Sequence, residues 1–249
     1  MSAARAELRG LLLPGAFAAM GLAVLAGLGF WQLERLAWKE DLIARVEART
    51  KVPVVPIPAE ADWPNVSASR DEYRRVIANG RFQHAREALV YTVLSEPKGR
   101  FSGQGYWVLT PLELPNGAIV IVNRGFVPLG RKDPSTRREG QIEGPVTVTG
   151  LLRMPEVGNW FTPANEPARG AWYRRDPSEI ARHFALVRAA PLMIDADAAP
   201  APGKLPQGGE TRLVFSNNHL GYALTWFGLA LALLGVFTVF ACQRLRGEH

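Results

Sequence analysis

Two long uncharged runs lie near the ends of the chain. Residues 11–33 and 220–242 contain no Asp, Glu, Lys or Arg. Each run exceeds the roughly 20 residues that a helix needs to cross a bilayer. Because hydrocarbon offers no water to backbone groups, a single segment there must be helical. The pattern therefore predicts two transmembrane helices.

Between the two runs, short apolar segments are typical of β-strands. Asn116-Gly117 lies between two of them and predicts a hairpin. Residues 177–186 favour a short helix, and 172–174 a further short strand. The strands are expected at residues 73–82, 88–94, 106–113, 118–123, 146–153 and 192–194.

The remaining segments connect these parts. Residues 34–50 alternate apolar and charged positions at helical spacing, which predicts a helix lying on the membrane or on the domain. Four prolines between 53 and 64 indicate a linker. Residues 196–210, rich in Pro, Gly and Ala, predict a surface loop, and 211–215 are expected to rejoin the domain.

The predicted fold class is an α+β membrane protein, in which two transmembrane helices flank an extracytoplasmic antiparallel β domain with a few helices. An antiparallel sheet and a small open barrel both fit the strand pattern. The expected parts are a tail at 1–10, a span at 11–33, a domain at 34–218, a span at 219–242 and a tail at 243–249.

The second span has two distinct faces. Small residues recur on one face, where another helix can approach closely: Gly221, Thr225, Gly228, Ala232 and Gly235. The opposite face carries His219, Tyr222, Ala223, Trp226 and Ala230. An alanine face of the first span is a plausible mate for the small face: Ala16, Ala19, Ala23 and Ala26. If that face packs elsewhere, His219 looks towards the first span, and the sequence leaves both arrangements open.

Charge near the chain ends predicts the topology. Arg5 and Arg9 precede the first span, and Arg244 and Arg246 follow the second. The positive-inside rule then places both termini in the cytoplasm, or in the matrix of a mitochondrion, with the central domain outside. Trp31 and Trp226 are expected at the outer interface, and His219 lies there as well.

Composition removes several function classes. The 249 residues include a single cysteine, Cys242, which excludes an intramolecular disulfide, a zinc thiolate cluster and a c-type haem attachment. The net charge of +6 is scattered among acidic residues, and no basic helix with interleaved aromatics suggests nucleic acid. No familiar nucleophile, phosphate-binding or metalloprotease motif is present, so nothing supports an enzyme.

His219 has two interpretations at the membrane boundary. A neutral imidazole nitrogen there can accept a proton or ligate a metal or haem iron, and it can equally be a polar interface residue. His84, just past a strand end, and His183, on a predicted helix, are expected at the surface of the domain.

The chain resembles the surfeit locus protein 1 family over nearly its whole length. The resemblance rests on many motifs in order: Gly29-Phe30-Trp31-Gln32 with Arg35 and Trp38-Lys39; Tyr73-Arg74 with Gly80 and Phe82; residues 105–112, 122–128 and 150–153; Pro163, Asn165, Trp172-Tyr173-Arg174 and Asp176; and Asn217-Asn218-His219-Leu220 with residues 222–227.

This resemblance implies a non-enzymatic assembly factor of cytochrome c oxidase that binds haem a as cargo and assists its insertion into subunit I. It also implies that His219 ligates the haem iron. Partners would be oxidase subunit I, haem a synthase and membrane lipid, without nucleic acid. Composition favours a bacterial plasma (inner) membrane, multi-pass, over the mitochondrial inner membrane.

Further haem contacts follow from a physical hypothesis of how such a chaperone would hold haem a. Tyr222 and Trp226 would lie against the macrocycle, with Trp31 and Gln32 as an opposite wall, while Arg124 and Arg174 would pair the propionates. Each of these residues also has an ordinary structural interpretation, as an interface residue, a helix cap or a salt bridge. Two other functions remain open, a haem-independent scaffold for an oxidase subunit and a membrane enzyme with an unrecognised site.

Overall fold

The structure is a computed structural model that describes residues 2–198, 202–213 and 217–246, with side chains from residue 10 onward. It divides into two compact units. One unit holds the terminal helices (residues 1–45 and 214–249), and the other is a β-rich domain (residues 46–213). Each is described by itself.

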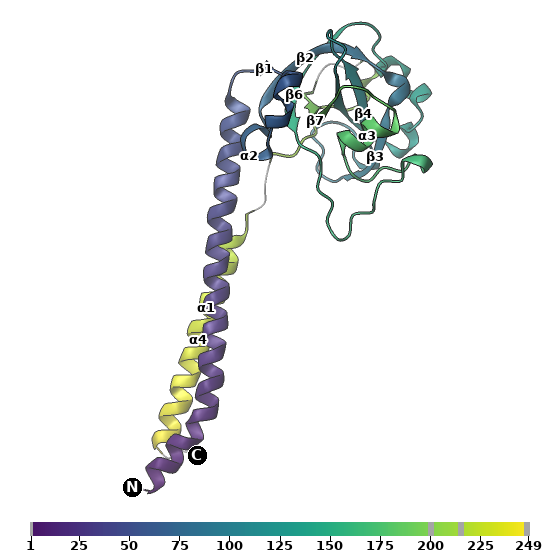
Figure 1. The fold of residues 1–249 in the computed structure, drawn as a ribbon. Coiled ribbons are helices and arrows are strands. Elements are labelled where there is room, and N and C mark those ends of the chain that lie inside the picture. The colour runs from purple at the N-terminus through teal and green to yellow at the C-terminus, as the bar shows by residue number, and fades with distance from the viewer. Residues whose placement is uncertain (1, 199–201, 214–216, 247–249) are drawn as a thin grey trace. The chain divides into compact units, whose positions relative to one another are not determined.

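The predicted helix at 177–186 and the six longer strands are confirmed in type, and two strand ranges agree to the residue (Figure 1). The short strand expected at 172–174 is wrong, because Trp172 forms only an isolated bridge with Val90. The helices are α1 (Ser2–Lys51), α2 (Ala68–Asp71), α3 (Pro177–His183) and α4 (His219–Arg246). The strands are β1 (Val55–Pro56), β2 (Arg75–Phe82), β3 (Ala88–Leu94), β4 (Gly103–Glu113), β5 (Ile119–Pro128), β6 (Val146–Arg153) and β7 (Ala189–Ala196).

In the β domain, β2, β6, β7, β5 and β4 form a ring. They neighbour one another in that order, and β4 pairs back onto β2 where Phe82 faces Leu112. β3 lies on the remaining edge of β4, and β1 on that of β2. The sheet is thus a closed small barrel with mostly antiparallel pairs, whereas β5–β7 and β1–β2 are parallel.

The hairpin predicted at Asn116-Gly117 joins β4 to β5. Gly117 adopts a φ of +80°, and its amide donates to the carbonyl of Leu114 at 2.9 Å. This is a three-residue loop in which a glycine supplies the left-handed conformation that closes a type I turn. The turn fixes the register of the two longest strands of the barrel.

Successive side chains of β5 point to opposite faces of the sheet and belong to two separate core clusters. Val120 and Val122 point into the ring, whereas Ile119 and Ile121 lie outside it, beneath α3. The inner cluster also draws Val76, Leu112, Val148, Leu152, Leu192 and Ile194 from the other strands. Because β5 is covered on both faces, its sequence reads as a continuous apolar run rather than an alternating one.

Two connecting segments differ from their predictions. The proline-rich stretch contributes β1, because a strand edge tolerates residues that lack an amide hydrogen. The stretch 196–210 is not a surface loop: Leu205, Gln207 and Glu210 are buried, and Gln207 exchanges backbone hydrogen bonds with Phe126. Of the expected rejoining segment, residues 214 and 215 lie outside the described ranges.

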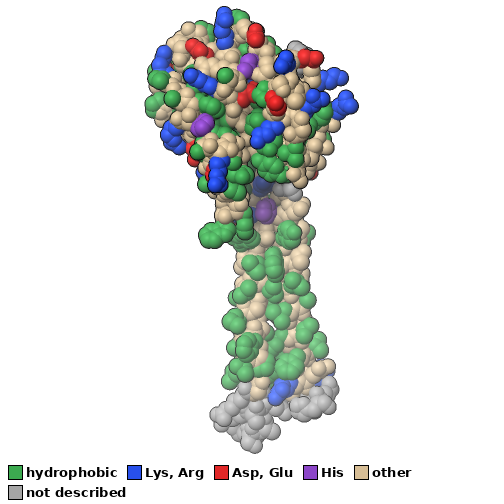
Figure 2. Space-filling view, turned by 90° about the vertical axis from the view of Figure 1, so that its right-hand side faces the viewer, with side chains coloured by type: hydrophobic (Ala, Val, Ile, Leu, Met, Phe, Trp, Pro, Cys, Tyr) green, Lys and Arg blue, Asp and Glu red, His purple; other side chains and the backbone are tan. Residues whose placement is uncertain are grey.

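The helical unit contains two helices long and apolar enough to cross a membrane, one over Gly10–Lys51 and one over His219–Arg246. Residues 34–50 are helical as predicted, and they continue the first helix without a break. Figure 2 shows hydrophobic side chains along the visible face of the pair. Together with the β-rich domain, these helices make the chain a membrane protein of the α+β class.

Candidate functional site

Helices α1 and α4 pack antiparallel along a regular seam. On each helix the least exposed residues recur at alternating spacings of three and four, typical of left-handed helix pairs. On α1 they are Gly15, Ala18, Leu22, Leu25, Gly29 and Gln32, and on α4 His219, Ala223, Trp226, Ala230, Leu233 and Phe237. The histidine face of α4 therefore meets the first span.

This seam resolves the alternative that the sequence left open. A β-carbon built on Gly221, Gly228 or Gly235 would meet nothing within 4 Å, so the small face of α4 is unpartnered among the described residues. The expected alanine mate is also wrong, because Ala16, Ala19 and Ala23 are exposed. Large side chains of α4 fill the glycine positions of α1 instead, as where Phe227 packs on Gly29.

His219 and Gln32 are joined across the seam. The distance from His219 Nδ1 to Gln32 Oε1 is 2.7 Å, and Gln32 is only 9% exposed. Since an amide oxygen only accepts, Nδ1 of the imidazole donates this hydrogen bond. Among the described residues Nε2 has no hydrogen-bond partner, so it remains available to a ligand.

The aromatic residues around this pair divide between two environments. Trp31 and Tyr222 are 50% and 57% exposed, and Trp226 is half-buried towards α1. Tyr222 thus leaves the face that it was predicted to share with Trp226. Phe30 and Phe227 meet edge to face, with ring centroids 5.4 Å apart, and brace the helices beside the pair. The chain thus exposes two aromatic rings close in sequence to Gln32 and His219, while the seam itself is packed.

Arg124 lies in the β domain, in a buried charge cluster. Its guanidinium contacts Glu87 at 3.2 Å and stacks on Phe82 at 4.7 Å. Burial raises the pKa of Glu87, but the adjacent His84, Arg137 and Arg124 outweigh it and bring that pKa down to about 2. For Arg124, burial acts in the opposite direction and lowers the pKa to about 10. Both groups are charged at neutral pH, and the cluster is a structural ion pair.

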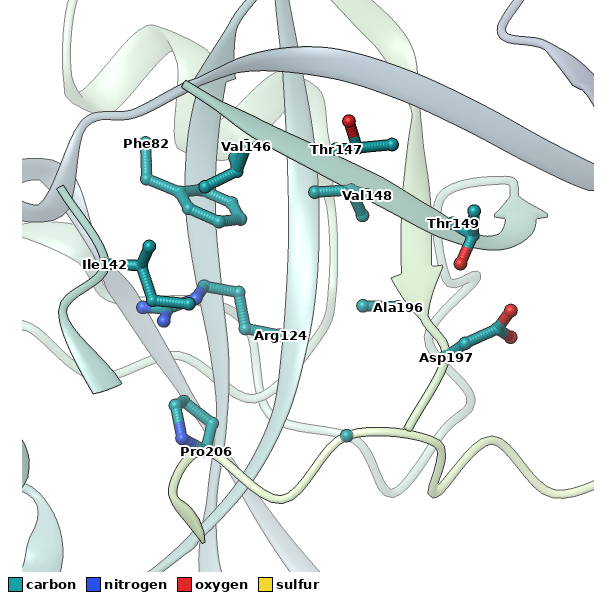
Figure 3. Close-up of a pocket in the computed structure, with 11 residues that line it drawn as sticks. Phe82, Arg124, Ile142, Val146, Thr147, Val148, Thr149, Ala196, Asp197 and Pro206 are labelled. Atoms are coloured by element: carbon teal, nitrogen blue, oxygen red, sulfur yellow. The ribbon is translucent and has the colours of Figure 1, made fainter. Parts of the chain in front are cut away.

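A pocket of about 260 Å³ opens beside Arg124 (Figure 3). Figure 3 shows the ring of Phe82 close to the guanidinium, with Ile142 and Val146 near it. The pocket walls are mostly apolar, and the two terminal nitrogens of Arg124 already donate to Glu87 and to the carbonyl of Gly140. A propionate would have to compete with both acceptors.

Arg174 is more accessible than Arg124. Its side chain is 28% exposed and pairs with Glu179 at 3.3 Å, while Asn165 binds its backbone amide. Arg124 and Arg174 belong to the β domain and His219 to the helical unit, so the structure does not bring them into one described site. Their pairing with haem propionates stays a prediction.

The remaining histidines of the domain have their own contacts. His84 is not at the surface as predicted: it is half-buried, with Nε2 2.8 Å from the carbonyl of Ile142 and Nδ1 3.3 Å from Arg124. His183 is exposed, as expected, and packs edge-on against Trp172. Over the described ranges, no group of three or more His, Cys, Asp or Glu is placed to hold a metal ion.

A second buried charge in the domain was missed from the sequence. Asp195 is 2% exposed and accepts from Asn123, Arg153 and Arg175, and from Thr211, which precedes the second span. Although burial raises the pKa of Asp195, the two guanidinium groups and these hydrogen bonds lower it below its ordinary value. The sequence does contain a signal for this buried charge, because Asp195 directly follows the apolar run 192–194.

Comparison with known proteins points to one family. A model of the SURF1 family matches residues 19–231, which include Gln32 and His219. The chain is 38% identical to surfeit locus protein 1 of Mus musculus over 221 residues, 84% of this chain and 70% of that protein. It is 38% identical to the Homo sapiens protein, over 83% of this chain and 70% of that protein. It is 34% identical to the Takifugu rubripes protein, over 84% of this chain and 89% of that protein.

Proposed function

Because the chain belongs to the SURF1 family, we propose that it is a non-catalytic assembly factor of a haem-copper cytochrome c oxidase. In this proposal it binds haem a as cargo and assists the insertion of haem a into subunit I. The observation that carries the proposal is the 2.7 Å hydrogen bond between His219 and Gln32. It presents a histidine nitrogen for coordination in a helix pair of a membrane protein.

In this proposal, Gln32 is the hydrogen-bond acceptor that a histidine ligand of haem or a metal commonly has on its other ring nitrogen. A histidine that ligates iron through one nitrogen usually donates its other N–H to an acceptor, which fixes the ring orientation and raises its basicity. Gln32 supplies such an acceptor from a buried position on α1. The residues present therefore fit haem iron at Nε2 of His219.

The surroundings suit a large apolar cargo that has to leave again. Trp31, next to Gln32, and Tyr222, three residues after His219, expose rings that can contact the macrocycle. Ligation by one histidine at an exposed face permits exchange with the histidines of an acceptor protein. The proposal keeps Trp226 as a support of the seam that positions His219.

The proposal includes a location and partners. Both termini would lie in the cytoplasm of a bacterium, with the β domain on the periplasmic side of the inner membrane, as the arginines of the tails favour. Haem a would arrive from haem a synthase and leave to oxidase subunit I. The tail charges and the resemblance support this arrangement.

Haem content tests the proposal directly. The full-length protein is purified from cells that make haem a, and its visible spectrum is recorded for the wild type and for His219→Ala. We expect the variant to lose its haem, and Gln32→Leu to lower haem affinity by about 10-fold or more. His249→Ala is the matched histidine control. A wild type free of haem, or equal haem in His219→Ala, contradicts the proposal.

A haem-independent scaffold is the second candidate, and the open small face of α4 favours it. Gly221, Gly228 and Gly235 leave room for another protein's helix to approach closely. Gly228→Leu would fill that face without touching the seam. If this variant lowers oxidase levels while His219→Ala does not, the scaffold explains the function better than haem delivery does.

A further inference from the structure

The segment between β6 and α3 ends in an unusually apolar tip. Val157, Trp160 and Phe161 are 96%, 93% and 88% exposed. Figure 1 shows this segment leaving the barrel as a long loop. Single exposed apolar residues are ordinary, but a group of large ones at one loop tip marks a contact with a partner or a membrane. We refer to residues 157–162 as the apolar tip.

The apolar tip carries no charge, and the acids on both sides of it are neutralised. Glu156, just before the tip, pairs with Arg175 at 2.5 Å. Glu166, after it, pairs with Arg169 at 3.0 Å. A carboxylate is costly to bring near lipid, and its pairing with a guanidinium reduces that cost. The segment thus combines three large apolar side chains with no unpaired acid.

Three backbone amides of the tip are hydrogen-bonded within the turn. Asn159 and Thr162 exchange hydrogen bonds across it, and the Asn159 side chain accepts from the amide of Phe161 at 2.9 Å. Amides bonded in this way lose less when the turn leaves bulk water. They are also not free to pair with a β-strand of a partner.

The base of this loop lies on the side of the domain from which both membrane connections leave. Arg49, at the end of α1, donates to the carbonyl of Glu72, whose carboxylate binds Arg153. Arg153 also binds Asp195, which holds Thr211 near the start of the second connection. One hydrogen-bonded network within the domain therefore links both chain exits to the end of β6.

The second connection is short. From Leu213 to His219 there are six residue steps, which reach at most about 20 Å even when fully extended. The part of the domain that holds Thr211 is thus joined to the second span by a chain segment no longer than that. The loop begins at the end of β6, in the same hydrogen-bonded network as Thr211, so the chain connects this part of the domain directly to a membrane span.

We propose that the apolar tip docks into the interfacial layer of this bilayer, with Trp160 and Phe161 among the lipid headgroups and upper acyl chains. Aromatic side chains are the residues that favour this depth. Lipid, rather than a protein partner, is the occupant favoured by the short connection to the second span, the paired acids and the absence of charge at the tip. This contact does not depend on haem.

Lipid quenching at the tip tests the proposal in the full-length protein. Cys242 is the only cysteine, so Cys242→Ser gives a background for single cysteine variants. Phe161→Cys reports on the tip, and Val187→Cys, 77% exposed on the turn before β7, is the matched control. Each variant is labelled with an environment-sensitive fluorophore and reconstituted in phosphatidylcholine vesicles, with or without phosphatidylglycerol. The vesicles contain a lipid with a nitroxide on its headgroup, which quenches a nearby fluorophore.

We expect several-fold stronger quenching at position 161 than at position 187, in both lipid mixtures, because the contact is apolar. Adding Trp160→Ser and Val157→Ser should abolish the difference and leave folding intact, since both residues are exposed. Equal quenching at the two positions overturns the proposal. Protection of position 161 that appears only when an oxidase subunit is added also overturns it, in favour of a protein partner.

Discussion

Glu87 is the carboxylate shared by two arginines in the buried charge cluster of the β domain. Its carboxylate is 5% exposed and pairs with Arg124 and Arg137, both of which are buried. Removing one partner of a buried ion pair leaves an uncompensated charge and typically costs 3–5 kcal/mol, so about 3 kcal/mol is expected for Glu87→Gln. Chemical unfolding of the full-length protein in detergent measures this loss.

A matched carboxylate provides the control for that measurement. Glu166 also pairs with an arginine, but the side chains are 49% and 80% exposed. Solvent screens such a pair, so Glu166→Gln should change the free energy of unfolding by less than about 1 kcal/mol. Equal losses for the two variants would contradict the structural role of the Glu87 cluster.

The same carboxylate predicts a pH dependence of stability. The pKa of Glu87 is about 2 in the folded domain, below its ordinary value of 4.5. A lowered pKa adds stability that is complete above pH 4.5 and disappears as the pH falls towards 2. The shift corresponds to about 3 kcal/mol. The stability difference between wild type and Glu87→Gln should shrink over this window. A difference that stays constant from pH 7 to pH 3 would contradict the assignment.

At the residue scale, the sequence singles out His219 but does not predict its hydrogen bond to Gln32. Spacing gives the face of one helix but not which face of another helix meets it. The sequence likewise leaves Arg124 available to a ligand, because its acceptors, Glu87 and Gly140, come from other parts of the chain. Long-range pairing of this kind leaves no local pattern.

At the scale of elements, alternation of apolar residues predicted most of the sheet. The ranges of β3 and β6 agree to the residue, and the Asn-Gly turn fixed the β4–β5 pairing. The short β1 was missed because its prolines indicate a break, although an edge strand accepts them. The closure of the ring was not predictable, since it depends on a pairing of only two residues between β2 and β4.

Substitutions at two glycines of α1 can distinguish the effect of packing in the seam from the effect of helix propensity. A β-carbon at Gly29 would lie 2.6 Å from the ring of Phe227, whereas one at Gly27 would meet nothing within 4 Å. Gly29→Val should therefore push the helices apart, break the His219–Gln32 bond and lower haem content several-fold. Gly27→Val, the control on the same helix, should leave haem content unchanged.

The visible spectrum of each purified variant provides the readout for this pair. Thermal unfolding in detergent shows whether the seam itself has weakened, and we expect a lower midpoint for Gly29→Val alone. If the two valine variants bind equal amounts of haem, the seam does not position the ligand.

At the scale of the whole molecule, the two compact units predict separable properties. Residues 46–213 contain their own buried clusters and should fold without the spans, as domains with a complete core do. Circular dichroism of this fragment should show a cooperative unfolding transition. In our proposal the fragment binds no haem a, because His219 lies outside it. Haem a binding by the fragment at the affinity of the full chain would place the site in the barrel.

The His219–Gln32 bond joins the two helices through the side chain that is proposed to hold the cargo. A ligand that moves the imidazole out of the seam therefore also pulls on the amide of α1. In our proposal, loading and release of the cargo would act on both spans at once.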